Sequence, residues 1–315
     1  MISAMSKLAI VDAHHHFWDL SKNPHPWLLD KPVEDFRYGD YSAIRRSYLP
    51  ADFQRDAANQ RLIGSVHVEA EWDPSDPLSE TRWLTARHQE CGLPTAIVGQ
   101  AWFARDDIAD VLAGQAENPL VRGVRQKPVA APRPEAVTAG AAGSMSDPAW
   151  RAGYALLADH GLSYDLQVPY WQLPEAAELA GDFPETLIIL NHAGLPADRS
   201  AAGLDGWRRA MAGFAACSNT AVKISGLGVP GRPWTVADNG PIVRTIIDLF
   251  GVDRCMFASN FPVDSLVADY DTLFDGFKAI VADLPFADQG KLFAENAIRL
   301  YRLDIDPRQP TQANR

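Results

Sequence analysis

Eight short apolar runs that alternate with helical patterns along 315 residues predict an α/β fold, namely a (β/α)8 TIM barrel. Each run is too short for a buried helix and ends in Gly, Pro or polar residues, which favours a strand. One strand and one helix recur every roughly 30–40 residues, as in such a barrel. A doubly wound open sheet is the alternative. The predicted strands are 8–18, 62–72, 95–103, 121–129, 162–170, 186–194, 220–228 and 254–262.

Helical patterns fill most of the gaps between these strands. Several carry Pro near the start and Gly near the end, an asymmetry typical of helices, and the clearest are 76–92, 147–161, 173–184 and 239–251. Residues 130–147 are small and Pro-containing, so we expect a mobile loop after the fourth strand. We predict one domain over 1–315, with its core at about 8–303 and a polar, frayed tail.

The bulk composition restricts the partners and the compartment. The net charge is -11, which argues against nucleic acid or an anionic membrane and leaves a small molecule as the expected partner. Cys91, Cys217 and Cys255 form no CxxC motif and suit a reducing compartment. Neither a signal peptide nor an apolar run of about 20 residues is present. We therefore expect a cytoplasmic globular protein. The composition is compatible with a homo-oligomer.

Three consecutive histidines close the first predicted strand. Alternate strand residues share a face, so His14 and His16 are expected at the barrel mouth and His15 on the other side. The pair could bind a metal or a substrate, or it could simply cap the core, and we weigh these equally. His192 closes the sixth strand and becomes a third member, because three histidines around one open position form a known zinc arrangement.

Charged residues end the second and fourth predicted strands. Arg125 and Lys127 share a face and suit a substrate carboxylate or an oxyanion, with a surface salt bridge as an equal alternative. His67, Glu69 and Glu71 are expected to alternate on one face, and Glu69 is a functional candidate because a buried carboxylate needs a partner. Further candidates at strand ends are Asp165, Gln167, Tyr170, Trp171, Lys223, Ser225, Ser259, Asn260 and Asp264.

One glycine-rich segment imitates a nucleotide-binding motif. The segment 226–231, GLGVPG, fits GxGxxG, but that fingerprint needs a helix directly after it, and the following RPWTVADNG is expected to open none. We predict a loop. No GxxxxGK[ST] or GxSxG motif is present, so phosphate-loop and serine-hydrolase functions lack support.

Five segments, VDAHHHFWD, GVRQ, NHAGLP, MFASNFPVD and NAIRLYRL, occur in this order over nearly the whole chain. Together they resemble the amidohydrolase-related (amidohydrolase 2) family of TIM-barrel hydrolases, in the branch of pyrone-dicarboxylate lactonase and sugar lactonases such as fuconolactonase. The resemblance implies hydrolysis of a cyclic ester by water, either with one divalent metal, Zn or Mn, or without one. It also implies that His14, His16 and His192 are the metal or catalytic residues and that Arg125 holds a substrate carboxylate or hydroxyl.

The chain departs from this family at the eighth strand. The family usually has an Asp there, which binds metal or acts as the general base, and this chain has Asn260. An amide does not accept a proton at neutral pH, so another group must serve. Asp264, Asp165 and Glu69 are the candidates. A metal-bound hydroxide would lessen the need for a protein base, because a metal lowers the pKa of its water to about 7.

Three functions follow from this pattern. The first is a lactone hydrolase acting on a small carboxylated or sugar-derived substrate, in which Tyr170 and Trp171 wall the pocket. The second is a metal-dependent decarboxylase built on the same barrel. The third is a ligand-binding barrel without catalysis, which the loss of a base at Asn260 allows. The lactone hydrolase is the hypothesis that we favour.

Overall fold

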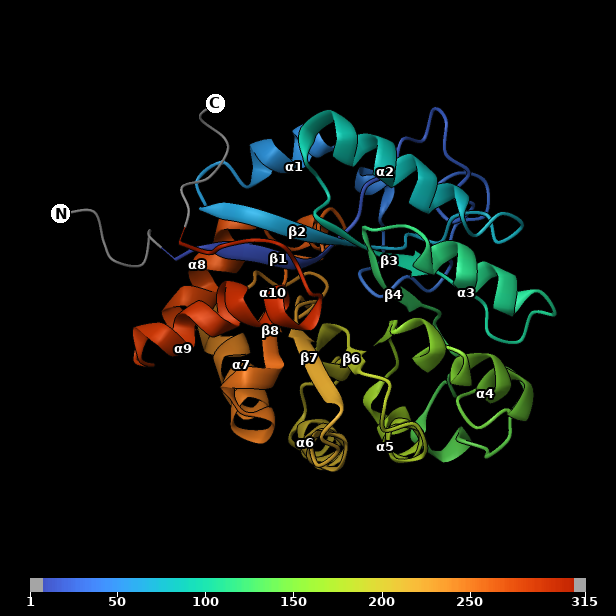
Figure 1. Cartoon of the computed structure of the whole chain (residues 1–315). Helices are drawn as coiled ribbons and strands as arrows, with labels where there is room; N and C mark the ends of the chain where they lie inside the picture. Colours follow the sequence, from blue (N-terminus) through green and yellow to red (C-terminus); the bar gives the residue numbers. More distant parts are fainter. Residues whose placement is uncertain (1–7, 309–315) are drawn as a thin grey trace.

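The computed structural model describes residues 8–308 and forms a nearly closed barrel of eight parallel strands with helices on its outside (Figure 1). The strands neighbour one another in chain order, which confirms the predicted barrel and excludes a doubly wound sheet. Their bounds are β1 Ile10–His15, β2 Leu62–Val68, β3 Ala96–Gln100, β4 Val121–Arg125, β5 Ser163–Leu166, β6 Ile188–Leu190, β7 Thr220–Ile224 and β8 Cys255–Phe257.

Helices follow the strands and are started by local caps. The side chains of Asp147, Ser200, Thr235 and Asp269 each accept a hydrogen bond from a backbone N–H in the first turn of the helix that follows. The bounds are α1 Pro50–Asp56, α2 Ser79–Cys91, α3 Ile108–Ala116, α4 Pro148–Ala155, α5 Leu173–Asp182, α6 Ala201–Ala215, α7 Val236–Phe250, α8 Tyr270–Ile280, α9 Phe286–Gly290 and α10 Asn296–Leu300.

Two predicted boundaries need correction. The strands occupy only the first part of each predicted run, and the remainder forms the loops at the barrel mouth. Helix α7 opens at Val236, inside the stretch that was expected to open no helix, because Thr235 caps it. The segment 226–231 is nevertheless a loop, as predicted. The predicted frayed tail falls mostly on residues 309–315, which lie outside the described residues, as does the start of the N-terminal segment.

The contact between β1 and β8, which we call the seam, differs from the seven regular strand pairs. It consists of one bridge between His15 and Phe261, with backbone bonds of 2.7 Å from His16 N to Phe261 O and 2.8 Å from Asn260 N to His14 O. Below the bridge, the Asp12 carboxylate replaces a backbone partner and accepts from Ser259 N at 2.9 Å. The seam therefore joins the first strand to the residues after the last one.

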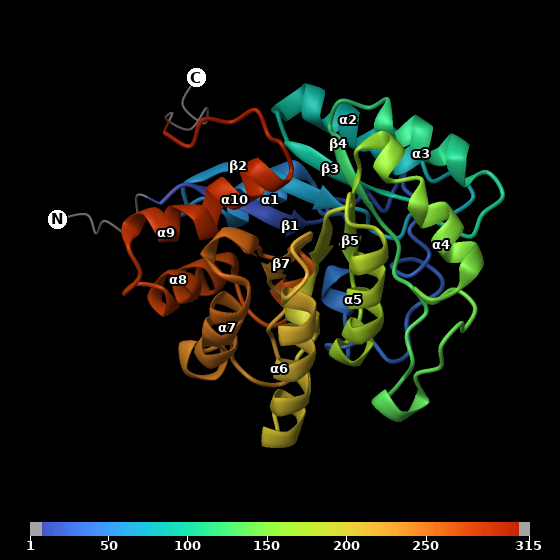
Figure 2. The same cartoon turned by 60° about the horizontal axis from the view of Figure 1, so that its bottom comes forward.

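The barrel interior is apolar toward the amino ends of the strands and is covered by the C-terminal helices. Small and branched side chains from several strands pack there against Tyr301 and other residues of the segment 294–303. Helix α10 lies beside β1 in both views and also contacts β8 (Figures 1 and 2). None of the helices between residues 8 and 308 combines the length and apolar character that a membrane crossing requires.

Candidate active site

The three consecutive histidines divide as strand alternation predicts. His14 and His16 face the same side, and their Nε2 atoms lie 3.3 Å apart. His15 turns outward, stacks on Phe53 with ring centroids 4.5 Å apart, and bonds Ser65 Oγ through Nε2 at 2.9 Å. All three are buried. The chain therefore commits two imidazoles to the inside of the barrel and uses the third in the packing of α1.

His192 joins this pair from the end of β6. Its ring centroid lies 4.5 Å from that of His14, and its Nδ1 lies 2.9 Å from Ser225 Oγ on the loop after β7. His192, Ala193 and Leu195 all have φ between 53° and 55°, a region that costs free energy for residues other than glycine. The sharp turn that results directs the His192 side chain across the barrel mouth.

Burial keeps the three inward imidazoles neutral. It is the largest cause that lowers the pKa of His14, His16 and His192 well below the ordinary value, and nearby cations, among them Lys223 and Arg125, act in the same direction. In neutral His16, Nδ1 carries the proton because it donates to Val68 O at 2.7 Å. Its Nε2 is then an acceptor for the Nε2–H of His14.

Asn260 faces the histidines and is held in place by Asp264. Its Nδ2 donates to Asp264 Oδ1 at 2.7 Å, which turns the amide oxygen away from that carboxylate. Asp264 also accepts from Tyr38 OH at 2.8 Å and from Gly226 N at 3.1 Å. It is buried and lines neither cavity described below, and burial raises its pKa. The geometry thus makes Asp264 a support for Asn260.

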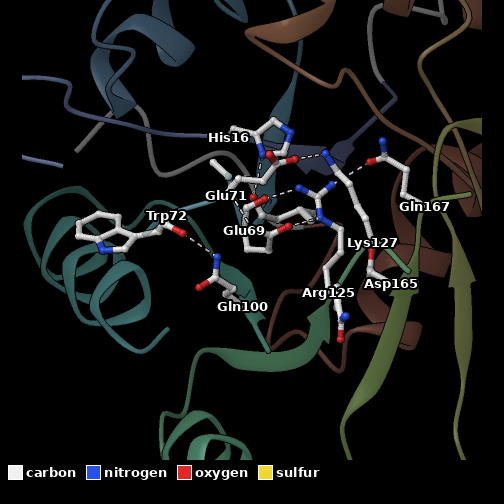
Figure 3. Close-up of polar contacts among 12 residues, drawn as sticks. His16, Glu69, Glu71, Trp72, Gln100, Arg125, Lys127, Asp165 and Gln167 are labelled. Carbon is white, nitrogen blue, oxygen red and sulfur yellow. Dashed lines mark hydrogen bonds and ion pairs between the residues drawn. The ribbon is translucent and has the colours of Figure 1, made fainter. Parts of the chain in front are cut away.

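Arg125, at the end of β4, is hydrogen-bonded to Glu69 and Gln167 (Figure 3). Its Nε donates to Glu69 Oε1 at 2.6 Å, its Nη2 donates to the Glu69 carbonyl, and its Nη1 donates to Gln167 Oε1 at 3.2 Å. Arg125 and Glu69 are both buried. The positive charge expected for a substrate carboxylate is therefore already matched by a carboxylate of the protein.

Lys127 forms a second ion pair beside the first, with Glu71 (Figure 3). Both side chains are about two-fifths exposed, at 40% and 38%. His67 does not share their face, contrary to the sequence prediction. The strand ends at Val68, and His67 points outward to Glu80, with Nε2 3.1 Å from Oε1. The chain bends after the strand, with φ 55° at Glu71, so strand alternation no longer applies.

Asp165 lies deeper than the sequence suggested. Gln167 follows the end of β5 and lines the inner cavity, whereas Asp165, within the strand, lines neither cavity. Its carboxylate accepts the one Tyr301 O–H, which lies 3.0 Å from each carboxylate oxygen, and pairs with Lys223 Nζ at 2.5 Å. Burial lowers the pKa of Lys223 to about 8, and the Asp165 charge opposes this. We call Asp165, Lys223 and Tyr301 the floor network.

Two adjoining cavities open above these groups. The inner cavity, about 280 Å³, is lined by His16, His192, Asn260, Arg125 and Lys127 among others. The outer cavity, about 610 Å³, is lined by loops that follow β4, β5, β6 and β7 and includes the predicted wall residues Tyr170 and Trp171. Arg37 and Leu195 line both, so the cavities share a boundary.

Sequence reasoning missed Arg37 and the role of one glycine. Arg37 lies in the irregular segment between β1 and α1, and its Nη2 donates to Gly226 O at 2.6 Å. No periodicity or motif around residues 30–40 marks it. Gly226 has φ +64°, and a Cβ there would lie 2.8 Å from Arg37 Nη2 and from His192 Cβ. The glycine-rich loop thus serves close packing around the site rather than nucleotide binding.

The histidines fit a metal ion only in part. Two tetrahedral ligands at Zn–N distances of about 2.0–2.1 Å lie about 3.3 Å apart, as His14 and His16 Nε2 do. However, no group of three or more His, Cys, Asp or Glu side chains in residues 8–308 is placed to hold one ion. The residue after β8 that could serve as a further ligand, Asn260, offers an amide instead of a carboxylate. The three-histidine metal site therefore stays a prediction, and we derive no step through a metal.

The chain is similar to known proteins over almost its whole length. A family model described as Amidohydrolase matches residues 11–303. Uncharacterized protein y4mH of Sinorhizobium fredii is 43% identical over 95% of this chain and 100% of its own length. The L-fucono-1,5-lactonase of Burkholderia ambifaria is 26% identical over 93% of this chain and 96% of its own. An amidohydrolase structure from Burkholderia multivorans with bound zinc has a TM-score of 0.77 at 25% identity, covering 94% and 99% of the two chains.

Proposed function

The chain belongs to the amidohydrolase family of TIM-barrel hydrolases, and from this premise we propose that it opens a lactone of a small carboxylated or sugar-derived substrate by water attack on the carbonyl. The observation that carries the proposal is His192, whose Nδ1 is held by Ser225 Oγ at the wall of a cavity of about 280 Å³ that Lys127 and Arg125 also line. A base beside cationic donors is what hydrolysis of an ester requires. The similarity to an L-fucono-1,5-lactonase supports this class of substrate.

We assign the general base to His192. The Nε2 atoms of His14 and His16 are hydrogen-bonded to each other. In contrast, Nε2 of His192 bonds to no protein group in residues 8–308. Its Nδ1 is held by Ser225, which leaves the Nε2 lone pair for water when Nδ1 carries the proton. Asn260 lacks a proton-accepting group, and Asp264 is screened behind it.

The proposed reaction has two steps. Water adds to the lactone carbonyl carbon while His192 Nε2 takes one of its protons, which gives a tetrahedral oxyanion. The carbonyl then re-forms, the ring C–O bond breaks, and the leaving oxygen takes the proton back from His192. The product is an open-chain hydroxy acid, and the histidine ends neutral as it began.

The oxyanion has two cationic neighbours. Arg125 uses three of its five N–H groups on Glu69 and Gln167, so two remain for a ligand. Lys127 is held beside the cavity by Glu71. We propose that these N–H groups stabilise charge that develops on the carbonyl oxygen, a contribution of about 2.7–4 kcal/mol for a donor in other hydrolases.

No metal enters this mechanism. Elemental analysis of purified protein for zinc and manganese distinguishes this mechanism from one that uses the predicted three-histidine metal site. We expect lactone hydrolysis to survive treatment with a chelator. Stoichiometric metal, with activity lost on chelation and restored by that metal, would contradict the mechanism and favour the three-histidine site.

The proposal is tested with a panel of lactones, including L-fucono-1,5-lactone and D-glucono-1,5-lactone, by acid release above the spontaneous rate. We expect His192→Asn to lower kcat by about 10²–10⁴ while the fold is retained, since a general base contributes about that factor. His160→Asn, a histidine outside both cavities, is the matched control. Absence of lactone turnover, together with carbon dioxide release from an aromatic acid, would replace the proposal by a decarboxylase.

A further inference from the structure

The outer cavity holds arginine side chains that the proposed reaction does not use. We infer that it is a second substrate subsite, which binds a planar group bearing a carboxylate. The preferred lactone then carries such an extension and is larger than one sugar ring. This inference rests on the proposed function, because it names the substrate class of the same site.

The two cavities are arranged for one extended molecule. The inner cavity is at the low end of ligand-pocket volumes, about 300–1,000 Å³, and the outer one is about twice as large. Arg37 and Leu195 line both of them. A lactone ring beside His192 would therefore leave its substituent pointing past Arg37 into the outer cavity.

Arg199 is the strongest indication of an anion in the outer cavity. It is partly buried in the cavity wall, and its Nη2 donates to Leu227 O at 2.8 Å. Its Nε and Nη1 are buried and have no hydrogen-bond partner. A buried donor without an acceptor costs about 1–3 kcal/mol, and more when it is charged. A ligand oxygen would supply the missing acceptor.

The charge balance separates this cavity from the inner one. Arg125 and Lys127 each have a carboxylate partner, whereas no ion pair within residues 8–308 engages Arg37 or Arg199. The outer cavity also contains exposed Arg133. Its two carboxylates, Glu135 and Asp198, are exposed, and Asp198 accepts from Ser200 N at 2.9 Å. Among the lining residues, three arginines therefore face two carboxylates, while Asp238 and Asp264, which do not line the cavity, act on Arg199 and Arg37.

The aromatic residues of the same cavity suit a flat group. Tyr170 and Trp171 pack edge to face with ring centroids 5.2 Å apart. Trp171 Nε1 donates to Ala131 O at 2.8 Å, which fixes the indole against the loop after β4. Rigid aromatic surfaces bind planar rings through offset or edge contacts. Arginines and aromatic rings in one cavity suit an aryl carboxylate.

The test uses binding rather than activity. Titration calorimetry compares 2-naphthoate with its neutral isostere 2-naphthamide. We expect the carboxylate to bind at least about tenfold more tightly, as charge-assisted hydrogen bonds allow. Arg199→Gln is expected to remove that preference and Arg199→Lys to keep part of it. Arg208→Gln, on the exposed side of α6, is the control and should change nothing.

The outcomes separate the two proposals. Equal binding of acid and amide by the native protein, or a preference that survives Arg199→Gln, would overturn the subsite even if lactones are hydrolysed. A preference that depends on Arg199 in a protein that hydrolyses no lactone would support the subsite and reject the proposed function. If Arg199→Gln does not fold, the acid–amide comparison and Arg199→Lys still decide.

Discussion

The floor network and the mouth of the barrel differ in the burial and the partners of their charged side chains. At the floor, Asp165 and Lys223 have fully buried side chains, and the carboxylate receives both the Lys223 ammonium and the Tyr301 hydroxyl. At the mouth, Lys127 and Glu71 are about two-fifths exposed, and Arg199 keeps nitrogens with no acceptor. The charges of the floor are paired within the chain, whereas Arg199 at the mouth has no carboxylate partner within residues 8–308.

This difference separates stability from function within one barrel. A buried ion pair that loses one partner leaves an uncompensated charge, so floor substitutions should act on the free energy of unfolding. An exposed pair contributes little to stability because water screens it. Substitutions at the mouth should therefore act on turnover and binding.

The largest effect is expected from Lys223→Met. It leaves the Asp165 carboxylate buried without its cation, and we expect a loss of about 3–5 kcal/mol in the free energy of unfolding, measured by urea denaturation. The double variant Lys223→Met, Asp165→Asn removes both charges and should recover most of that loss. A single variant as stable as the native protein would show that the floor is not a closed network.

Lys127→Met tests the mouth in the same way. We expect the free energy of unfolding to change by no more than about 0.5 kcal/mol, because the ion pair with Glu71 is half-exposed. The kcat/KM for a lactone should fall about tenfold or more, since a cation beside the cavity is lost. Lys22→Met removes a lysine from a surface pair and is the control. A stability loss that exceeds the activity loss would reverse the comparison.

Asn260→Asp places a second carboxylate next to Asp264. The two oxygens would meet where Nδ2 now donates at 2.7 Å, so they share a proton at low pH and repel at high pH. We expect the variant to be destabilised by at least about 1.4 kcal/mol more at pH 8 than at pH 5, equivalent to one pKa unit. Thermal unfolding of variant and native protein at both pH values measures this. A gain of lactone hydrolysis would instead favour a native binding barrel.

The last prediction concerns Glu80, a buried residue in the first turn of α2. Burial raises its pKa to about 8 from 4.5, so the folded chain holds a proton that the unfolded chain releases between these values. Stability should therefore fall as pH rises from 5 to 8. Glu80→Gln should weaken this slope in thermal unfolding, whereas exposed Glu90→Gln on the same helix should leave it unchanged. A slope unaltered by Glu80→Gln would contradict a protonated Glu80.

Sequence patterns predicted features set by regular backbone and missed those set by irregular backbone. The period of two placed His14 and His16 together and turned His15 away, because β1 extends through His15. The same rule was wrong for His67 and Glu69, since β2 ends between them. Arg37 and Arg199 lie on loops, where no repeat relates sequence position to direction. The sequence also did not indicate how deep in the barrel Asp165 lies, because its position on the strand does not predict the hydrogen bond with Tyr301.

The seam has a consequence for the order in which the protein becomes functional. His14 is near the beginning of the chain, yet its backbone carbonyl bonds to Asn260, and the floor under the site needs Tyr301. A nascent chain that has left the ribosome only as far as residue 250 contains seven strands and all three inward histidines, but it lacks Asn260 and Phe261, to which β1 bonds at the seam. The site is therefore assembled last, and a truncated translation product should have neither a closed barrel nor a hydrolytic centre.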